Sequence, residues 1–202
     1  MNPTHVTIIP AAGHSDDEGK YTRGRYVDTI SEVEIVDQYS RTLCEILEEY
    51  GVSHSVMDTR RAPGVKESER LGSVRQGSIF VGLGVGWFDN LLKRNRSEVF
   101  YVTPESRKLA AMVGETVGDW GRCSSYKHVA GNPKELRNGF LRVSGPVGIL
   151  LEPFALNGPH YCDYLPMLGS LGRYVGMTII EYMVSNNPTA GYQPFTVKHY
   201  AP

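Results

Sequence analysis

The chain has 202 residues, of which 41% are hydrophobic and 21% charged, and a formal net charge of -1. This composition is typical of one soluble globular domain, and the balanced charge gives no reason to expect nucleic acid or an anionic membrane as a partner. No basic segment followed by an apolar run stands at the N-terminus, so we expect synthesis in the cytoplasm without a signal peptide. The three cysteines, Cys44, Cys123 and Cys162, are widely spaced and typical of reduced core residues.

The first half of the chain alternates between strand and helix patterns. An apolar run at residues 6–10 predicts a buried strand, and a polar, glycine-containing loop follows to about residue 29. Apolar residues then recur at three- and four-residue steps, which predicts a helix that buries Val33, Val36, Tyr39, Leu43, Ile46, Leu47 and Tyr50. Ser31 and Glu34 fit a capping box at its start, and Gly51 fits a C-cap at its end. Strands are predicted next at 53–58 and 78–83.

The second half continues the alternation. The patterns predict a strand at 98–102, a helix at 104–120, a strand at 147–151 and a final helix at 165–183. Strands that alternate with helices predict an α/β fold, with a mostly parallel twisted sheet covered by helices on both faces. We expect a single domain over residues 1–202, with its core at about 5–184 and a C-terminal tail at 185–202.

Three polar side chains are expected at one edge of this sheet, where His14 and Glu32 should be accessible. His14 follows the first strand, Glu32 begins the first helix, and Glu152 ends a later strand. Ligands of α/β proteins bind at the carboxyl ends of the strands, and a histidine with two carboxylates there could hold a metal and supply a general base. A loop histidine or a glutamate in a first helical turn is ordinary by itself. A carboxylate at the boundary of a buried strand is costly, which favours a functional role for Glu152.

The order of these motifs resembles that of the zinc-dependent N-acetylmuramoyl-L-alanine amidases of the amidase 3 type. The resemblance covers residues 5–184. It rests on the strand that leads to Gly13-His14, on Glu32 with Leu43, Leu47 and Gly51 in its helix, on Thr59-Arg60 and Glu69-Arg70, and on Leu141-Arg142, Glu152, Phe154 and Asn157 around the strand at 147–151. Ala11 departs from the pattern, since an Asp often stands three residues before the histidine.

The resemblance implies a role for each of these polar residues. His14 and Glu32 would be ligands of one zinc ion, Glu152 would be the catalytic carboxylate, and Arg142 and Asn157 would bind substrate. The family's second histidine ligand is replaced by Gly84, and Gly86 stands where Asn is usual. Glycine has no side chain to coordinate zinc. His128 and His160 are the candidate substitutes, although a surface position is the ordinary expectation for each.

Three functions follow as alternatives. The first is a peptidoglycan hydrolase that cleaves the amide between N-acetylmuramic acid and L-alanine with zinc-activated water. Such a chain resembles a phage endolysin, which would act on the cell wall after release or as part of a virion. The second is a non-catalytic amidase-like protein that binds peptidoglycan or a protein partner, because the glycines at 82, 84 and 86 would let a ligand approach closely. The third is another zinc peptidase or deacylase on a similar fold.

Overall fold

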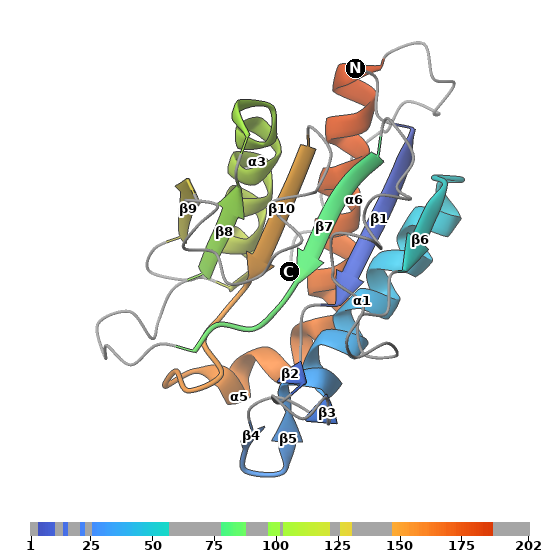
Figure 1. Cartoon of the computed structure of the whole chain (residues 1–202). Helices are drawn as coiled ribbons and strands as arrows, with labels where there is room; N and C mark the ends of the chain where they lie inside the picture. Colours follow the sequence, from blue (N-terminus) through green and yellow to red (C-terminus); the bar gives the residue numbers. More distant parts are fainter. Residues whose placement is uncertain are drawn as a thin grey trace.

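A six-stranded sheet forms the centre of the computed structural model, which describes residues 4–10, 14–15, 21–22, 26–56, 78–87, 97–101, 103–121, 126–130 and 147–187. The strand order is β6 (His54–Val56), β1 (His5–Pro10), β7 (Ser78–Leu83), β10 (Val147–Glu152), β8 (Ser97–Tyr101) and β9 (Tyr126–Ala130). The first four strands are parallel, β8 is antiparallel to β10, and β9 is parallel to β8 (Figure 1). The predicted α/β fold with a mostly parallel sheet is confirmed.

Both faces of the central strands are buried. In β1, Ile8 packs in the main hydrophobic core, while Thr7 and Ile9 point to the opposite face and are also buried. The same holds for Val81 and Phe80 of β7. Strands that are covered on both faces contain continuous apolar runs, and the sequence of these segments shows such runs.

The three long helices among the described residues lie on one face of the sheet, whereas the sequence predicts helices on both faces. Helix α6 (Leu168–Asn186) packs between α1 (Glu32–Glu49) and α3 (Pro104–Gly121), and contacts both (Figure 1). None of the described helices is both long and apolar enough to cross a membrane. The close approach of α6 to α1 depends on Gly172, because a Cβ atom there would lie 2.2 Å from the carbonyl oxygen of Tyr39.

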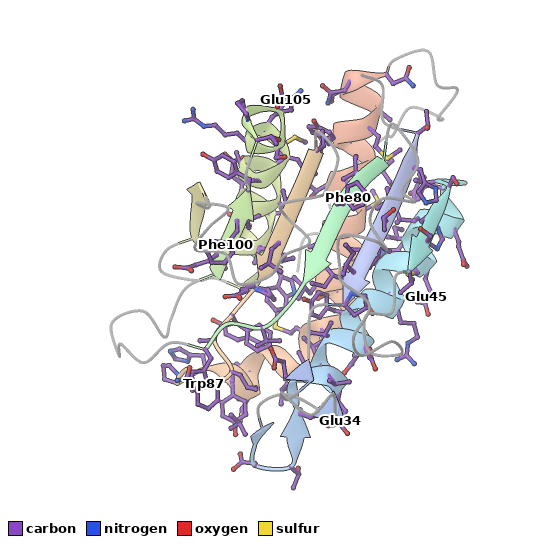
Figure 2. The ribbon with its side chains drawn as sticks, in the orientation of Figure 1. Glu34, Glu45, Phe80, Trp87, Phe100 and Glu105 are labelled. Carbon is purple, nitrogen blue, oxygen red and sulfur yellow. The ribbon has the colours of Figure 1, made fainter. Side chains whose placement is uncertain are left out.

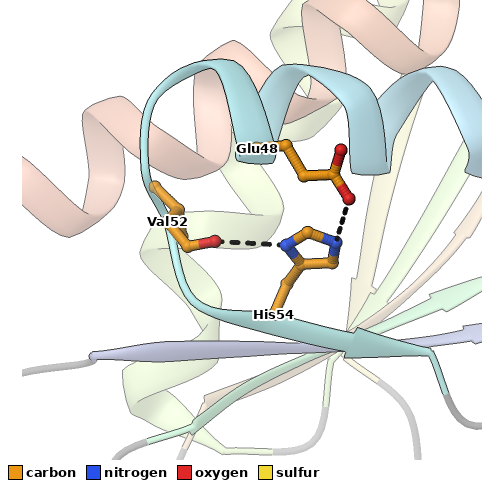
Figure 3. Close-up of polar contacts among 3 residues, drawn as sticks. All are labelled: Glu48, Val52 and His54. Carbon is orange, nitrogen blue, oxygen red and sulfur yellow. Dashed lines mark hydrogen bonds and ion pairs between the residues drawn. The ribbon is translucent and has the colours of Figure 1, made fainter.

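The predicted ends of α1 are confirmed. The Glu34 amide donates to the Ser31 hydroxyl at 3.3 Å, and the Ser31 amide donates to the Glu34 carboxylate at 2.8 Å, which is a capping box. Gly51 has a φ of 66°, a left-handed conformation that ends the helix at low cost. Beyond it, His54 donates from Nδ1 to the carbonyl of Val52 at 3.1 Å, and its Nε2 lies 3.8 Å from the Glu48 carboxylate (Figure 3).

Several short elements differ from the predictions. The region predicted as a loop contains two small hairpins, β2 (His14–Ser15) with β3 (Tyr21–Thr22) and β4 (Tyr26–Val27) with β5 (Ile30–Ser31). The last helix is preceded by α5 (Tyr161–Tyr164) and a 3-10 turn, η3 (Leu165–Met167). Pro166 explains the interruption, because its nitrogen carries no proton for a helical hydrogen bond. Strand β9 has no counterpart among the predicted strands.

Candidate functional site

The pairing of β7 with β10 continues beyond the ends of both strands. The Gly84 amide donates to the carbonyl of Leu151 at 2.9 Å, and the Gly86 amide donates to that of Phe154 at 2.9 Å. This register places Gly84 beside Glu152, the last residue of β10. A Cβ atom at position 84 would lie 3.7 Å from Cγ of Glu152, an ordinary van der Waals contact. A side chain at position 84 would therefore point toward the Glu152 carboxylate.

Tyr39 connects α1 to this strand end. Its side chain is completely buried, and its hydroxyl donates a hydrogen bond to the carbonyl of Gly84 at 2.8 Å. Burial raises the pKa of the Tyr39 phenol well above its ordinary value, and the charges of Glu152 and then Glu32 raise it further. Glu152 lies beside Gly84 at the end of β10, and Glu32 begins α1 about two helical turns before Tyr39. The Tyr39–Gly84 hydrogen bond thus connects the helix that begins at Glu32 to the strand end beside Glu152.

Glu32 is the first residue of α1 and is only 8% exposed. The sequence predicts an accessible position for Glu32, whereas the structure buries it. The capping box of the helix is formed by Glu34 and does not explain Glu32. A carboxylate in the first turn is stabilised by the helix dipole, which lowers the cost of keeping this charge buried.

Glu98 is a carboxylate of this region that sequence reasoning missed. In the antiparallel register of β8 and β10, Glu98 stands directly opposite Glu152. It is 8% exposed. Residues in such cross-strand pairs have Cβ atoms about 4.5–5.5 Å apart. The sequence did not reveal this pairing because the apolar pattern of β8 does not specify that the strand runs antiparallel to β10.

The segments that carry the carboxylates are held from outside the sheet. Phe154, two residues beyond Glu152, is buried and packs on Tyr164 with ring centroids 5.0 Å apart. The hydroxyl of Tyr161 donates to the carboxylate of Asp28, in the turn of the β4–β5 hairpin that leads into Glu32. This bond links the chain after Glu152 to the chain before Glu32. Figure 2 shows Glu34 and Trp87 at this same end of the sheet.

The other predicted site residues have mixed outcomes. Asn157 is half-buried and lies just past the bridge between Gly86 and Ala155, at the same end of the sheet. The backbone of His14 is in β2, four residues after the end of β1 and so within about 14 Å of it, but its side chain lies outside the described part of the chain. Arg142 also lies outside the described residues, as do Arg60, Glu69 and Arg70.

The two substitute histidines are not placed at Gly84. His160 is exposed at the start of α5, and its Nδ1 lies 3.3 Å from the Asp163 carboxylate. His128 is on the edge strand β9, which β8 separates from β10. Among the described side chains, no group of three or more His, Cys, Asp or Glu could hold a metal ion.

The donor set fits a zinc ion in part. Zinc takes imidazole nitrogen and carboxylate oxygen, which His14 and Glu32 would supply. Gly84 contributes no donor, but a Cβ atom there would make only ordinary van der Waals contacts, and its φ is not in the left-handed region. The predicted ligand set therefore consists of His14 and Glu32, with no donor at position 84.

Solved structures show what this architecture is similar to. N-acetylmuramoyl-L-alanine amidase AmiC2 of Nostoc punctiforme superposes with a TM-score of 0.69 at 20% identity, covering 89% of this chain and 96% of that one. An N-acetylmuramoyl-L-alanine amidase of Clostridium difficile gives 0.71 at 19% identity, covering 92% and 99%. The chain has the fold of these amidases. The catalytic domain of an endolysin targeting Clostridia difficile gives 0.66 at 17% identity, covering 91% and 98%. No protein-family model and no curated protein matches the sequence.

Proposed function

We propose that the chain is a peptidoglycan hydrolase that cleaves the amide between N-acetylmuramic acid and L-alanine. The observation that carries the proposal is the Tyr39–Gly84 hydrogen bond, which connects the helix that begins at Glu32 to the strand end beside Glu152, in a sheet with the amidase fold. Amide hydrolysis needs a group that moves a proton and a group that polarises the carbonyl. Two carboxylates from distant segments, connected in this way, suit that chemistry.

Each residue has a distinct role in the proposal. His14 and Glu32 would hold zinc, which when bound polarises the scissile carbonyl and lowers the pKa of its water. Glu152 accepts the proton of the attacking water and delivers it to the departing nitrogen of L-alanine. Arg142 and Asn157 bind the substrate. As in an endolysin, the protein would reach the wall after release from the cytoplasm or as part of a virion.

The test is the substitution Glu152→Gln, which keeps the shape of the side chain and removes its proton-accepting oxygen. Release of free L-alanine amino termini from purified peptidoglycan should fall at least about a hundredfold, because general base catalysis contributes 10²–10⁴-fold. Zinc content and thermal stability should stay close to those of the wild type. Glu181→Gln, at an exposed position of α6, is the matched control and should keep full activity. Wild-type activity in Glu152→Gln would show that Glu152 is structural.

Gly84 favours a second candidate, a non-catalytic amidase-like protein that binds peptidoglycan or a protein partner. Two features of the glycine segment weaken this candidate. Gly82, Gly84 and Gly86 are buried, and the amides of Gly84 and Gly86 already donate to the β10 segment, so they are not offered to a ligand. Co-sedimentation with peptidoglycan in the presence of zinc, without release of amino termini, would support the binding protein over the hydrolase.

A further inference from the structure

Tyr39 is a polar residue inside the hydrophobic core between α1 and the sheet. It follows Glu32 by about two helical turns, so the two residues share a face of α1. Its ring is packed among apolar side chains, where phenylalanine would serve equally well for packing alone. The hydroxyl adds nothing to the apolar packing and must be hydrogen-bonded, because a buried polar group without a partner is costly.

The hydroxyl is satisfied at the end of β7. It donates to the carbonyl of Gly84 at 2.8 Å, and the amide of the same residue donates to Leu151 in β10 at 2.9 Å. Gly84 is therefore held from two sides, by a helix and by a neighbouring strand. The next residue of β10 after Leu151 is Glu152. A short chain of contacts thus runs from Tyr39 through Gly84 to Glu152, and Glu32 begins the helix that carries Tyr39.

Helix α6 holds Tyr39 in place from behind. A Cβ atom at Gly172 would lie 2.2 Å from the carbonyl oxygen of Tyr39 and 2.9 Å from the amide nitrogen of Leu43. The backbone of α1 at Tyr39 is thus in close contact with the backbone of α6. The hydroxyl of Tyr39 projects from a rigid part of the fold, which suits it to fix the position of a strand end.

We propose that Tyr39 is a positioning residue of the candidate site: its hydroxyl holds the carbonyl of Gly84, fixes the end of β7 against β10, and so sets the separation between Glu32 and Glu152. The expected effect of the Tyr39 hydroxyl on turnover rests on the proposed function, whereas its expected effect on the end of β7 is independent of that function. The hydrogen bond uses the backbone carbonyl of Gly84, whereas a Cβ atom at this position would lie beside Glu152, so the two contacts of position 84 are separate.

Tyr39→Phe tests this role against a matched control. The control is Tyr182→Phe, because Tyr182 is also buried and its hydroxyl donates to a backbone carbonyl, that of Glu105, at 3.4 Å. Glu105 lies at the opposite end of the sheet from Glu34, as Figure 2 shows. Both variants remove one hydroxyl from a buried tyrosine, and only the first is next to the site.

Two measurements separate the inference from the proposed function. Amide hydrogen exchange at Gly84 and Gly86, followed by NMR, should accelerate about tenfold in Tyr39→Phe and stay unchanged in Tyr182→Phe, since one buried hydrogen bond is lost. The kcat for release of amino termini should fall about tenfold to a hundredfold in Tyr39→Phe with little change in KM, as for other residues that orient a metal site. Tyr182→Phe should keep the wild-type kcat.

Other outcomes would refute either the positioning role of Tyr39 or the proposed hydrolase activity. Exchange at Gly84 and Gly86 that matches the control would show that Tyr39 is only a core residue. Faster exchange with an unchanged kcat would refute its role in positioning Glu32 and Glu152. Faster exchange in a protein whose wild type hydrolyses nothing, even with zinc, would leave the anchoring of β7 supported and would refute the proposed hydrolase.

Discussion

Gly172→Ala should destabilise the protein through a backbone clash. The new Cβ would lie 2.2 Å from the carbonyl oxygen of Tyr39, 2.9 Å from the amide nitrogen of Leu43 and 3.0 Å from Cβ of Thr42. Real Cβ atoms do not approach other atoms so closely, and two of these three are backbone atoms that cannot rotate away. Helices α1 and α6 must therefore separate, or the variant must distort one of them.

The magnitude follows from two opposing effects. Overpacking of a tight core costs about 1–3 kcal/mol. Replacing glycine by alanine inside a helix stabilises the helix by about 0.5–1 kcal/mol. Gly169 is also in α6, and a Cβ there would meet nothing within 4 Å, so Gly169→Ala has the helical gain without the clash. The difference between the two variants is thus the packing cost, about 1–3 kcal/mol.

Urea unfolding followed by circular dichroism measures this difference through the transition midpoints. Gly176→Ala should also lower the midpoint, because its Cβ would meet Cγ2 of Ile46 at 2.0 Å, and the buried, β-branched side chain of Ile46 has little freedom to rotate. Equal midpoints for Gly172→Ala and Gly169→Ala would refute the reasoning, since they would show that α1 and α6 are not in close backbone contact at Tyr39.

Three further predictions concern the site. His14→Ala and Glu32→Ala should each lower the zinc content, measured by elemental analysis, and should lower the urea midpoint much less. Equal zinc content in the wild type and in both variants would contradict the assignment of His14 and Glu32 as ligands. Gly84→His should raise zinc affinity, and with it the turnover that depends on Glu152, because a Cβ atom there meets only ordinary contacts and the imidazole would supply the missing donor. A folded variant with unchanged zinc affinity would mean that the site is remodelled beyond one residue. Folding raises the pKa of Tyr39, so the phenol ionises more easily in the unfolded chain, and the free energy of unfolding should fall as pH rises above about 10. The urea midpoint should therefore fall less between about pH 9 and about pH 11 in Tyr39→Phe than in the wild type. An identical fall in both proteins would contradict the raised pKa of Tyr39.

The amino-acid sequence alone predicts the elements with strong periodicity. The helix that starts at Glu32, its capping box and its glycine end all appear as expected, because these features depend on residues within a few positions of one another. The buried strands β1, β7 and β10 were visible as continuous apolar runs for the same reason. Expecting His14, Glu32 and Glu152 at one sheet edge needed only the rule for α/β folds.

Tertiary structure decided the features that depend on distant segments. The antiparallel direction of β8 places Glu98 opposite Glu152, and no local pattern specifies which way a strand runs in a sheet. The role of Tyr39 was equally hidden, because in the helical pattern it is one more core residue, and its hydrogen bond to Gly84 joins segments 45 positions apart. Local chemistry thus sets the helices, strands and caps, whereas the link from Tyr39 through Gly84 to Glu152 results from packing α1 and β10 against the end of β7.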